Sequence, residues 1–337
     1  MASQLRLAVD AMSGDHGLRS SISASLNALN QNSALHICLV GDEAAIRSSL
    51  LASNYDSARL SICHSPDVVA MDDLPSKALR YKKQSSMYRA LELLRDGNVA
   101  GVVSAGNTGA LVAMGCIILD RLPGVRRPAI CAPVPAKNGY TLMLDLGANI
   151  ECDAEHLYQF AVMGAALSNA LDGRDAPRLA LLNVGAELIK GTSVVKEAAE
   201  LISADSRLNY IGFAEGNDIF SENIDVMVCD GFTGNVALKV CEGTANFIRG
   251  QLKETFMKSL YGRLAALVVK PVLNAFQKDI NPERYNGAAL LGLNGVVIKS
   301  HGGSSVKSFE AAIHQAARAV DGDLTQAIAS QLHTTES

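Results

Sequence analysis

Short apolar runs alternate with helical patterns over most of the chain, and this alternation limits the folds that the chain can adopt. Apolar runs at 5–10, 35–40, 99–103 and 178–182 are each followed by a polar loop and then by apolar residues at helical spacing. Such runs are typical of buried strands, and strands that alternate with helices form βαβ units. We therefore predict an α/β fold with a mostly parallel sheet that helices cover on both faces.

The alternation continues without a linker through the 337 residues, so we predict a single α/β unit over 1–337. Strand-like runs at 128–134 and 140–144 flank Asn138-Gly139, a dipeptide that is typical of hairpin turns. We expect one antiparallel strand pair at this point in an otherwise parallel sheet.

Residues 238–285 depart from the pattern, because they read as long helix with basic and apolar residues mixed along it. We predict a helical protrusion here. Two interpretations remain open: the protrusion packs against a second copy in a dimer, or its basic, apolar face rests on an anionic membrane. Both can hold together.

Composition narrows the class of protein. The chain is 48% hydrophobic and 19% charged with a net charge of -4, which is typical of a soluble protein and disfavours a general nucleic-acid partner. Neither a signal peptide nor an apolar run of membrane-spanning length is evident. Seven scattered cysteines without a CxxC pair indicate reduced thiols, so we expect a cytoplasmic protein.

Five junctions share one design, in which an apolar strand leads through a small polar loop with glycine into a helix. In a parallel sheet such loops gather at one edge, where ligands bind. Backbone N–H groups, hydroxyls, amides and Lys190 would meet there and suit a phosphate or a developing oxyanion. The junctions are Asp10–Gly17, Ser104–Gly109, Asn183–Thr192, Asp230–Asn235 and Ser300–Ser305.

Other site types are disfavoured by missing motifs. The chain has no GxGxxG turn, no GxxxxGK[ST] loop, no HExxH pair and no GxSxG elbow. These absences argue against dinucleotide, ordinary P-loop, zinc-protease and hydrolase sites, so we expect neither a metal nor a cofactor.

Several single residues can each be interpreted in two ways, as functional or as structural. Cys229 has the position of a nucleophile, but a buried thiol is favoured at the end of an apolar strand. His301 suits acid–base chemistry or a backbone contact within its loop. Lys190 is either a ligand-binding cation or a solvated lysine. Asp10 and Asp15 would repel phosphate, so we expect them to orient loops or bind a substrate amide.

Five segments resemble the bacterial phosphate acyltransferase family, in order and over nearly the whole chain. They are Val9-Asp10-Ala11-Met12-Ser13-Gly14-Asp15-His16, Ser104-Ala105-Gly106-Asn107-Thr108-Gly109-Ala110, Asn183-Val184-Gly185, Asp230 to Lys239, and Leu290 to Gly302. One departure is in the first loop, where Ser13 and Gly17-Leu18 replace the glycine and the proline-containing pair common in the family.

The resemblance implies an enzyme that moves a fatty acyl group from acyl-[acyl carrier protein] to inorganic phosphate. The acyl phosphate would supply a downstream glycerol-3-phosphate acyltransferase in phospholipid synthesis. The family fold is a Rossmann-like α/β/α sandwich related to phosphotransacetylases. Its members are cytosolic homodimers at the membrane periphery, with a helical protrusion at the dimer.

The family's important lysine and asparagine fall on Lys190 and Asn235, which we predict to be catalytic. The predicted phosphate- and substrate-binding residues are Asp10, Gly14, Asp15, Ser104, Gly106, Asn107, Thr108, Gly109, Asn183, Gly231, Thr233, Gly234, His301 and Ser304. Two rivals remain: a phosphotransacetylase-like enzyme that uses a small acyl-CoA, and a non-enzymatic anion-binding scaffold.

Overall fold

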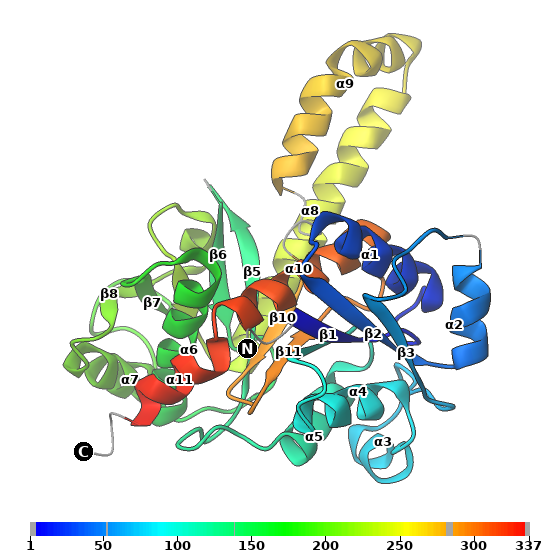
Figure 1. Ribbon diagram of the computed structural model, residues 1–337. Coiled ribbons are helices and arrows are strands. Elements are labelled where there is room, and N and C mark those ends of the chain that lie inside the picture. Colours follow the sequence, from blue (N-terminus) through cyan, green and yellow to red (C-terminus); the bar gives the residue numbers. More distant parts are fainter. Residues whose placement is uncertain (1–4, 52, 138, 281–285, 334–337) are drawn as a thin grey trace.

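A computed structural model describes residues 5–51, 53–137, 139–280 and 286–333, and one large sheet runs through it (Figure 1). The sheet has 11 strands in the order β3-β2-β1-β4-β11-β10-β5-β6-β9-β7-β8. The strands are β1 (Leu5–Asp10), β2 (Leu35–Gly41), β3 (Leu60–His64), β4 (Gly101–Ser104), β5 (Ala129–Ala136), β6 (Gly139–Leu144), β7 (Arg178–Leu182), β8 (Asn209–Ala214), β9 (Val226–Val228), β10 (Ala288–Leu291) and β11 (Val296–Lys299).

Helices cover both faces of the sheet. They are α1 (Leu18–Gln31), α2 (Glu43–Leu50), α3 (Pro75–Tyr81), α4 (Ser86–Arg95), α5 (Thr108–Ile118), α6 (Ala154–Asp172), α7 (Ser193–Ala204), α8 (Gly231–Met257), α9 (Leu260–Ile280), α10 (Val306–Asp321) and α11 (Leu324–His333), with a 3₁₀ turn at Gly216–Phe220. The predicted three-layer α/β/α sandwich is confirmed.

Alternating residues of the strands feed two separate cores, because successive side chains in a strand point to opposite faces. Leu7 and Val9 belong to a buried cluster with residues of α1, α6 and α10. Ala8 between them belongs to a second cluster with residues of α4 and α5. The central strands are therefore buried on both sides, which explains their continuous apolar runs.

The two ends of the sheet run in opposite directions, and this corrects one prediction. Strands β1 to β4 and β11 are mutually parallel, as are β6 to β9. Three successive antiparallel pairings, β11 with β10, β10 with β5 and β5 with β6, join the two groups. The carboxyl ends of all the strands therefore do not share one edge, as we had expected.

The predicted hairpin is confirmed as β5 and β6, although Asn138 itself lies outside the described residues. The second antiparallel strand, β10, was not predicted. It is only four residues long and lies close before β11 in the sequence, so the Leu290–Gly302 segment does not show a clear strand pattern of its own.

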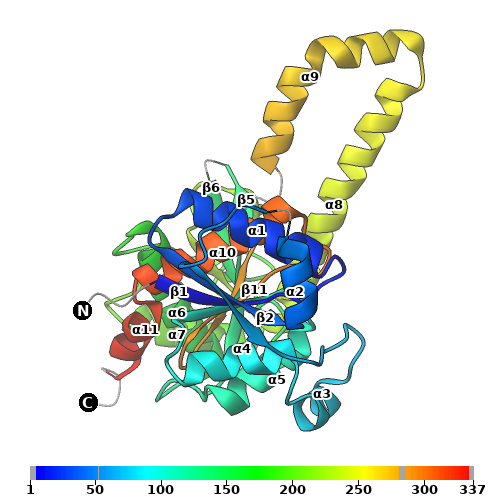
Figure 2. The ribbon, with the colours of Figure 1, turned by 45° about the vertical axis from the view of Figure 1, so that its right-hand side comes forward.

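Helices α8 and α9 form a hairpin that projects from the body of the molecule (Figures 1 and 2). The helix begins at Gly231, earlier than the predicted 238, and a break at 258–259 divides what we had predicted as one helix. Residues 281–285, the end of the predicted protrusion, lie outside the described residues. No helix in the described ranges has the length and apolar character needed to cross a membrane.

Candidate functional site

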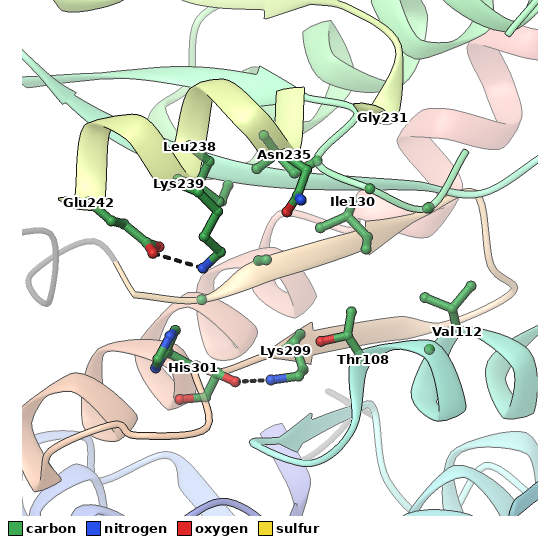
Figure 3. Close-up of a pocket in the computed structure, with 18 of the residues that line it drawn as sticks. Thr108, Val112, Ile130, Gly231, Asn235, Leu238, Lys239, Glu242, Lys299 and His301 are labelled. Carbon is green, nitrogen blue, oxygen red and sulfur yellow. Dashed lines mark hydrogen bonds and ion pairs between the residues drawn. The ribbon is translucent and has the colours of Figure 1, made fainter. Parts of the chain in front are cut away.

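A pocket of about 650 Å³ lies between the first turns of α8, the start of α5 and the end of β11 (Figure 3). Strand β5 and the loop 146–150 supply more of its lining. Segments that are far apart in the sequence therefore meet around one space. We take this pocket as the candidate active site.

Polar groups face each other across the pocket. Asn235 and Lys239 extend from α8, and Lys299 and His301 lie on the strand-end side (Figure 3). Thr108 stands at the start of α5. Asn235 and Lys239 are four residues apart, so they share one face of the helix. The pocket thus offers amide, hydroxyl, imidazole and two ammonium groups to a ligand. It also contains the Glu242 carboxylate, which pairs with Lys239 at 2.7 Å.

Apolar side chains complete the lining. They come from α5, β5, the loop 146–150 and α8: Val112, Ile130, Leu146, Ile150, Phe232 and Leu238. A ligand with an anionic end and a hydrocarbon part would match both kinds of surface.

Two glycines place Asn235 in the pocket, because they let α8 start directly against the loop 145–149. A Cβ on Gly231 would lie 2.5 Å from the carbonyl oxygen of Asn149, and a Cβ on Gly234 would overlap the carbonyl oxygen of Asp145. The loop is itself fixed by the buried Asp145 carboxylate, which accepts from the backbone N–H of Ile130 at 2.9 Å and of Asn149 at 2.6 Å.

The Asp230 side chain caps the N-terminus of α8, and the phosphate-binding role of Thr233 stays a prediction. The Asp230 carboxylate accepts from the Thr233 N–H at 2.9 Å and from its hydroxyl at 2.6 Å. A carboxylate at a helix N-terminus satisfies the free donors and offsets the positive end of the dipole. The first turn of α8 therefore offers one free N–H group fewer to an anion.

A buried polar cluster joins the ends of β1 and β4. Ser104 Oγ donates to Asp10 Oδ2 at 2.7 Å and accepts from the Gly106 N–H at 3.1 Å, while Ser13 Oγ accepts from the Ala105 N–H at 3.0 Å. Burial is the main cause that raises the pKa of Asp10, and serine hydrogen bonds oppose it. Gly14 is needed for close approach, since its φ is +82° and a Cβ would lie 2.9 Å from the Gly302 carbonyl oxygen.

Other predicted residues hold loops together. The Asn107 amide donates to the carbonyl oxygens of Met71 and Asp73, both at 2.9 Å. The Asp15 N–H donates to the carbonyl oxygen of Gly302 at 2.8 Å. Ser304 Oγ lies 2.9 Å from Ser300 Oγ. His301 Nδ1 accepts from the Gly303 N–H at 3.1 Å, so the predicted backbone contact is present while the ring also lines the pocket.

Lys190 and Asn183 lie in an exposed loop after β7, outside the residues that line the pocket. Lys190 Nζ pairs with the Glu187 carboxylate at 2.8 Å, and this bond raises the pKa of Lys190. The Asn183 amide donates to the carbonyl oxygens of Gly185 and Lys190 at 3.1 and 3.3 Å. The catalytic role of Lys190 stays a prediction.

Of the predicted residues, the pocket brings together Thr108, Gly109, Gly231, Asn235 and His301. The sequence interpretation missed Lys239 and Lys299 as lining residues. Helical spacing from Asn235 could have found Lys239. Lys299 could have been found as a charged residue at the end of the otherwise apolar run 296–299.

The cysteines do not supply a nucleophile here. Cys229 is 4% exposed, its thiol donates weakly to the Asp145 carbonyl oxygen at 3.7 Å, and burial raises its pKa well above the ordinary value. The predicted buried thiol is confirmed. Within the described part of the chain, no three His, Cys, Asp or Glu side chains gather as a metal site would require.

Comparisons with known proteins agree with this geometry. The family model described as "Fatty acid synthesis protein" matches residues 5–327. The chain is 48% identical over 328 residues to a phosphate acyltransferase of Hydrogenovibrio crunogenus, covering 97% of each chain. It is 51% identical over 316 residues to one of Methylococcus capsulatus, covering 94% of this chain and 93% of that one.

The fold resembles that of a solved phosphotransacetylase from Streptococcus pyogenes. The TM-score is 0.62 at 17% identity, and the match covers 95% of each chain. This likeness confirms the predicted relation of the fold to phosphotransacetylases. The resemblance found in the sequence is confirmed as well: the chain belongs to the fatty acid synthesis protein family and is an acyltransferase.

Proposed function

We propose that the pocket transfers a fatty acyl group from the thioester of an acyl carrier protein to inorganic phosphate. The observation that carries this proposal is the joining of cationic and amide groups with an apolar lining in one pocket. The acyl phosphate product is an activated acyl donor, which suits a following enzyme that acylates glycerol 3-phosphate.

The chemistry balances without a cofactor. A phosphate oxygen attacks the thioester carbonyl carbon and forms the new C–O bond, and collapse of the tetrahedral oxyanion breaks the C–S bond. The sulfur leaves as thiolate and takes the proton that phosphate brought, which gives acyl phosphate and free thiol. Binding both reactants in one pocket removes much of the entropic barrier, an effect that supplies about 7–11 kcal/mol at best.

Direct attack needs no acyl-enzyme, and this fits the burial of Cys229. Asn235 is exposed to the pocket, and its side-chain amide is the donor that we assign to phosphate or to the oxyanion. Lys190 keeps its proposed role as a second cation, which would require it to leave Glu187 and approach the pocket.

One experiment separates this function from its rivals. The protein is incubated with phosphate and either acyl carrier protein thioester or acyl-CoA, and acyl phosphate is trapped with hydroxylamine. We expect acyl hydroxamate with the carrier-protein substrate. Product with acyl-CoA alone would support a phosphotransacetylase-like enzyme, and product with neither would support a non-enzymatic scaffold.

The α8–α9 hairpin is our proposed dimer contact. Large apolar side chains along it are exposed, among them Phe247, Leu260, Tyr261 and Val268 at 65–83%. Exposed apolar surface of this extent is typical of interaction sites. Sedimentation equilibrium should give a dimer, and Phe247→Glu should shift it toward monomer. A monomeric wild-type protein would contradict this proposal.

Membrane association is a separate proposal for the same hairpin. A groove of about 530 Å³ between α8 and α9 is lined by Arg249, Lys253, Arg263 and Lys270 beside Leu252, Phe256 and Leu267. Basic and apolar groups together suit a peripheral contact with an anionic bilayer, at the inner membrane face for a cytoplasmic protein. Flotation with anionic but not with neutral vesicles would support it, and equal or absent binding would contradict it.

A further inference from the structure

Lys299 differs from the other lysines around the pocket. Its residue is only 8% exposed, yet it lines the pocket. Among the described residues no carboxylate lies within 4.0 Å of its ammonium group, which donates to the Ser300 carbonyl oxygen. Lys239 across the pocket, by contrast, pairs with Glu242 at 2.7 Å. Lys299 thus has hydrogen-bonding capacity left for a ligand.

Asp10 is a buried acid two strands away from Lys299, and Ser104 links them, because Ser104 pairs with Lys299 in the register of β4 and β11 and its hydroxyl donates to Asp10. It is 1% exposed at the end of β1, and its Oδ2 accepts from Ser104 at 2.7 Å. Its Oδ1 is fully buried without a hydrogen-bond partner. Ser86 lies near enough to lower the pKa of Asp10, but its hydroxyl does not meet the geometry of a hydrogen bond either.

The burial of the Lys299 ammonium group is costly unless a ligand compensates its charge. Asp10 is not among the residues that line the pocket, so only Lys299 bears on a ligand there. A buried lysine without a close ion pair loses hydration, and a buried carboxylate oxygen without a donor loses it too. An anion in the pocket would compensate the ammonium group. A cation that lines a pocket is also what phosphate binding requires.

We propose that Lys299 is the catalytic cation that binds phosphate in the pocket, and that Asp10, joined to the neighbouring strand by Ser104, is a positioning residue for Lys299. This inference rests on the acyl transfer proposed above and assigns the phosphate to one side of that pocket. Asn235 on the opposite side then donates to the acyl oxyanion as it forms.

The charged groups around Lys299 set its titration. Burial is the largest influence and lowers its pKa to about 8; Lys239 on α8 lowers it further, whereas Asp10 on β1 and Asp15 in the next loop raise it. His301 lies on the following loop. Phosphate binding should therefore weaken as pH rises through about 8, where free Lys299 loses its proton. Inorganic phosphate is already a dianion there, so its own ionisation does not cause this loss.

The test is the pH dependence of kcat/KM for phosphate, followed by incorporation of labelled phosphate into acyl phosphate. We expect an alkaline limb near pH 8 in the wild-type enzyme. Asp10→Asn should move that limb to lower pH, because it removes the buried negative charge. Lys299→Arg should move it to higher pH, and Lys299→Met should abolish it and lower kcat/KM for phosphate about 10²-fold.

Lys307→Met is the matched control, since Lys307 is an exposed lysine in the first turn of α10. It should behave like the wild type. An unchanged limb in Asp10→Asn would overturn the role of Asp10, and a normal phosphate KM in Lys299→Met would overturn that of Lys299. Circular dichroism checks that each variant is folded.

Phosphate binding measured by calorimetry separates this inference from the proposed function. If the wild-type protein makes no acyl phosphate, the proposed function fails. Phosphate binding by the wild type that is lost in Lys299→Met would still support Lys299 as the phosphate site. If the enzyme is active and Lys299→Met binds phosphate normally, the inference fails and the function stands.

Discussion

The loop 183–192 and the strand end at 299–301 each present a lysine, but in opposite settings. Lys190 is exposed and paired with Glu187, and this pair raises its pKa. Lys299 is 8% exposed without a close acid among the described residues, and burial lowers its pKa to about 8. Lys190 already has an anionic partner in Glu187, whereas Lys299 has none within 4.0 Å among the described residues and is available to an anionic ligand. The family motifs indicate Lys190 as the catalytic lysine, and the pocket indicates Lys299.

The largest effect should follow from Lys299→Met. Removing the charge that faces phosphate should lower kcat/KM for phosphate about 10²-fold, as when a transition-state contact is lost. The KM for the acyl donor should change much less. Initial rates at varied concentrations of phosphate and of the acyl donor measure the kinetic constants for each substrate. Equal changes for phosphate and for the acyl donor would indicate that Lys299 acts only through packing.

Asn235→Ala should cost about 10²-fold in kcat, because a donor to the oxyanion acts in the transition state and little in the ground state. Asn223→Ala, at an exposed position before β9 and outside the pocket lining, is the control. Steady-state kinetics of both variants tests this, and a wild-type kcat for Asn235→Ala would remove this residue from the chemistry.

The loss of Lys299 should lower activity, but it should not lower the stability of the folded protein. Because its pKa in the folded protein, about 8, lies below the ordinary 10.5, the unfolded chain binds more protons between these pH values. Stability should therefore rise with pH across this window, and below it the folded protein carries a cost on the order of 1–3 kcal/mol.

Lys299→Met should consequently be as stable as the wild type or more stable at pH 7, and its stability should not rise from pH 8 to pH 10 through this group. Urea denaturation at several pH values measures this. A strongly destabilised variant would mean that Lys299 stabilises the fold and is not kept for ligand binding.

The smallest of these effects should come from Lys190→Ala, at about tenfold in kcat/KM, because an exposed and already paired charge contributes little where it stands. The same assay as for Lys299→Met allows direct comparison. If Lys190→Ala were the more damaging change, the loop 183–192 would have to act inside the pocket, and our ranking of the two lysines would be reversed.

Local pattern was enough to predict much of the fold. Apolar runs such as 5–10 and 99–103 became buried strands, and Asn138-Gly139 marked the β5–β6 hairpin. The opposed directions of the two sheet halves could not be predicted, because they depend on how β10 and β5 pair. Those pairings join residues about 160 positions apart, and no local signal sets them.

Motifs predicted some of the residues that line the candidate pocket. Thr108, Asn235 and His301 line the pocket, whereas Asn107 and Thr233 are occupied by contacts within their own loops. Sequence pattern cannot tell a free polar group from a satisfied one. Burial and hydrogen bonding decide that, and they single out Lys299, which had been quoted only as part of a motif.

Formation of acyl phosphate by the wild-type enzyme and by Lys299→Met, from carrier-protein thioester at rising phosphate concentration, tests the central claim most directly. We predict product with the wild-type enzyme and a phosphate KM raised far more than the donor KM in the variant. Identical phosphate curves for the two proteins would contradict the claim that this pocket binds phosphate through Lys299.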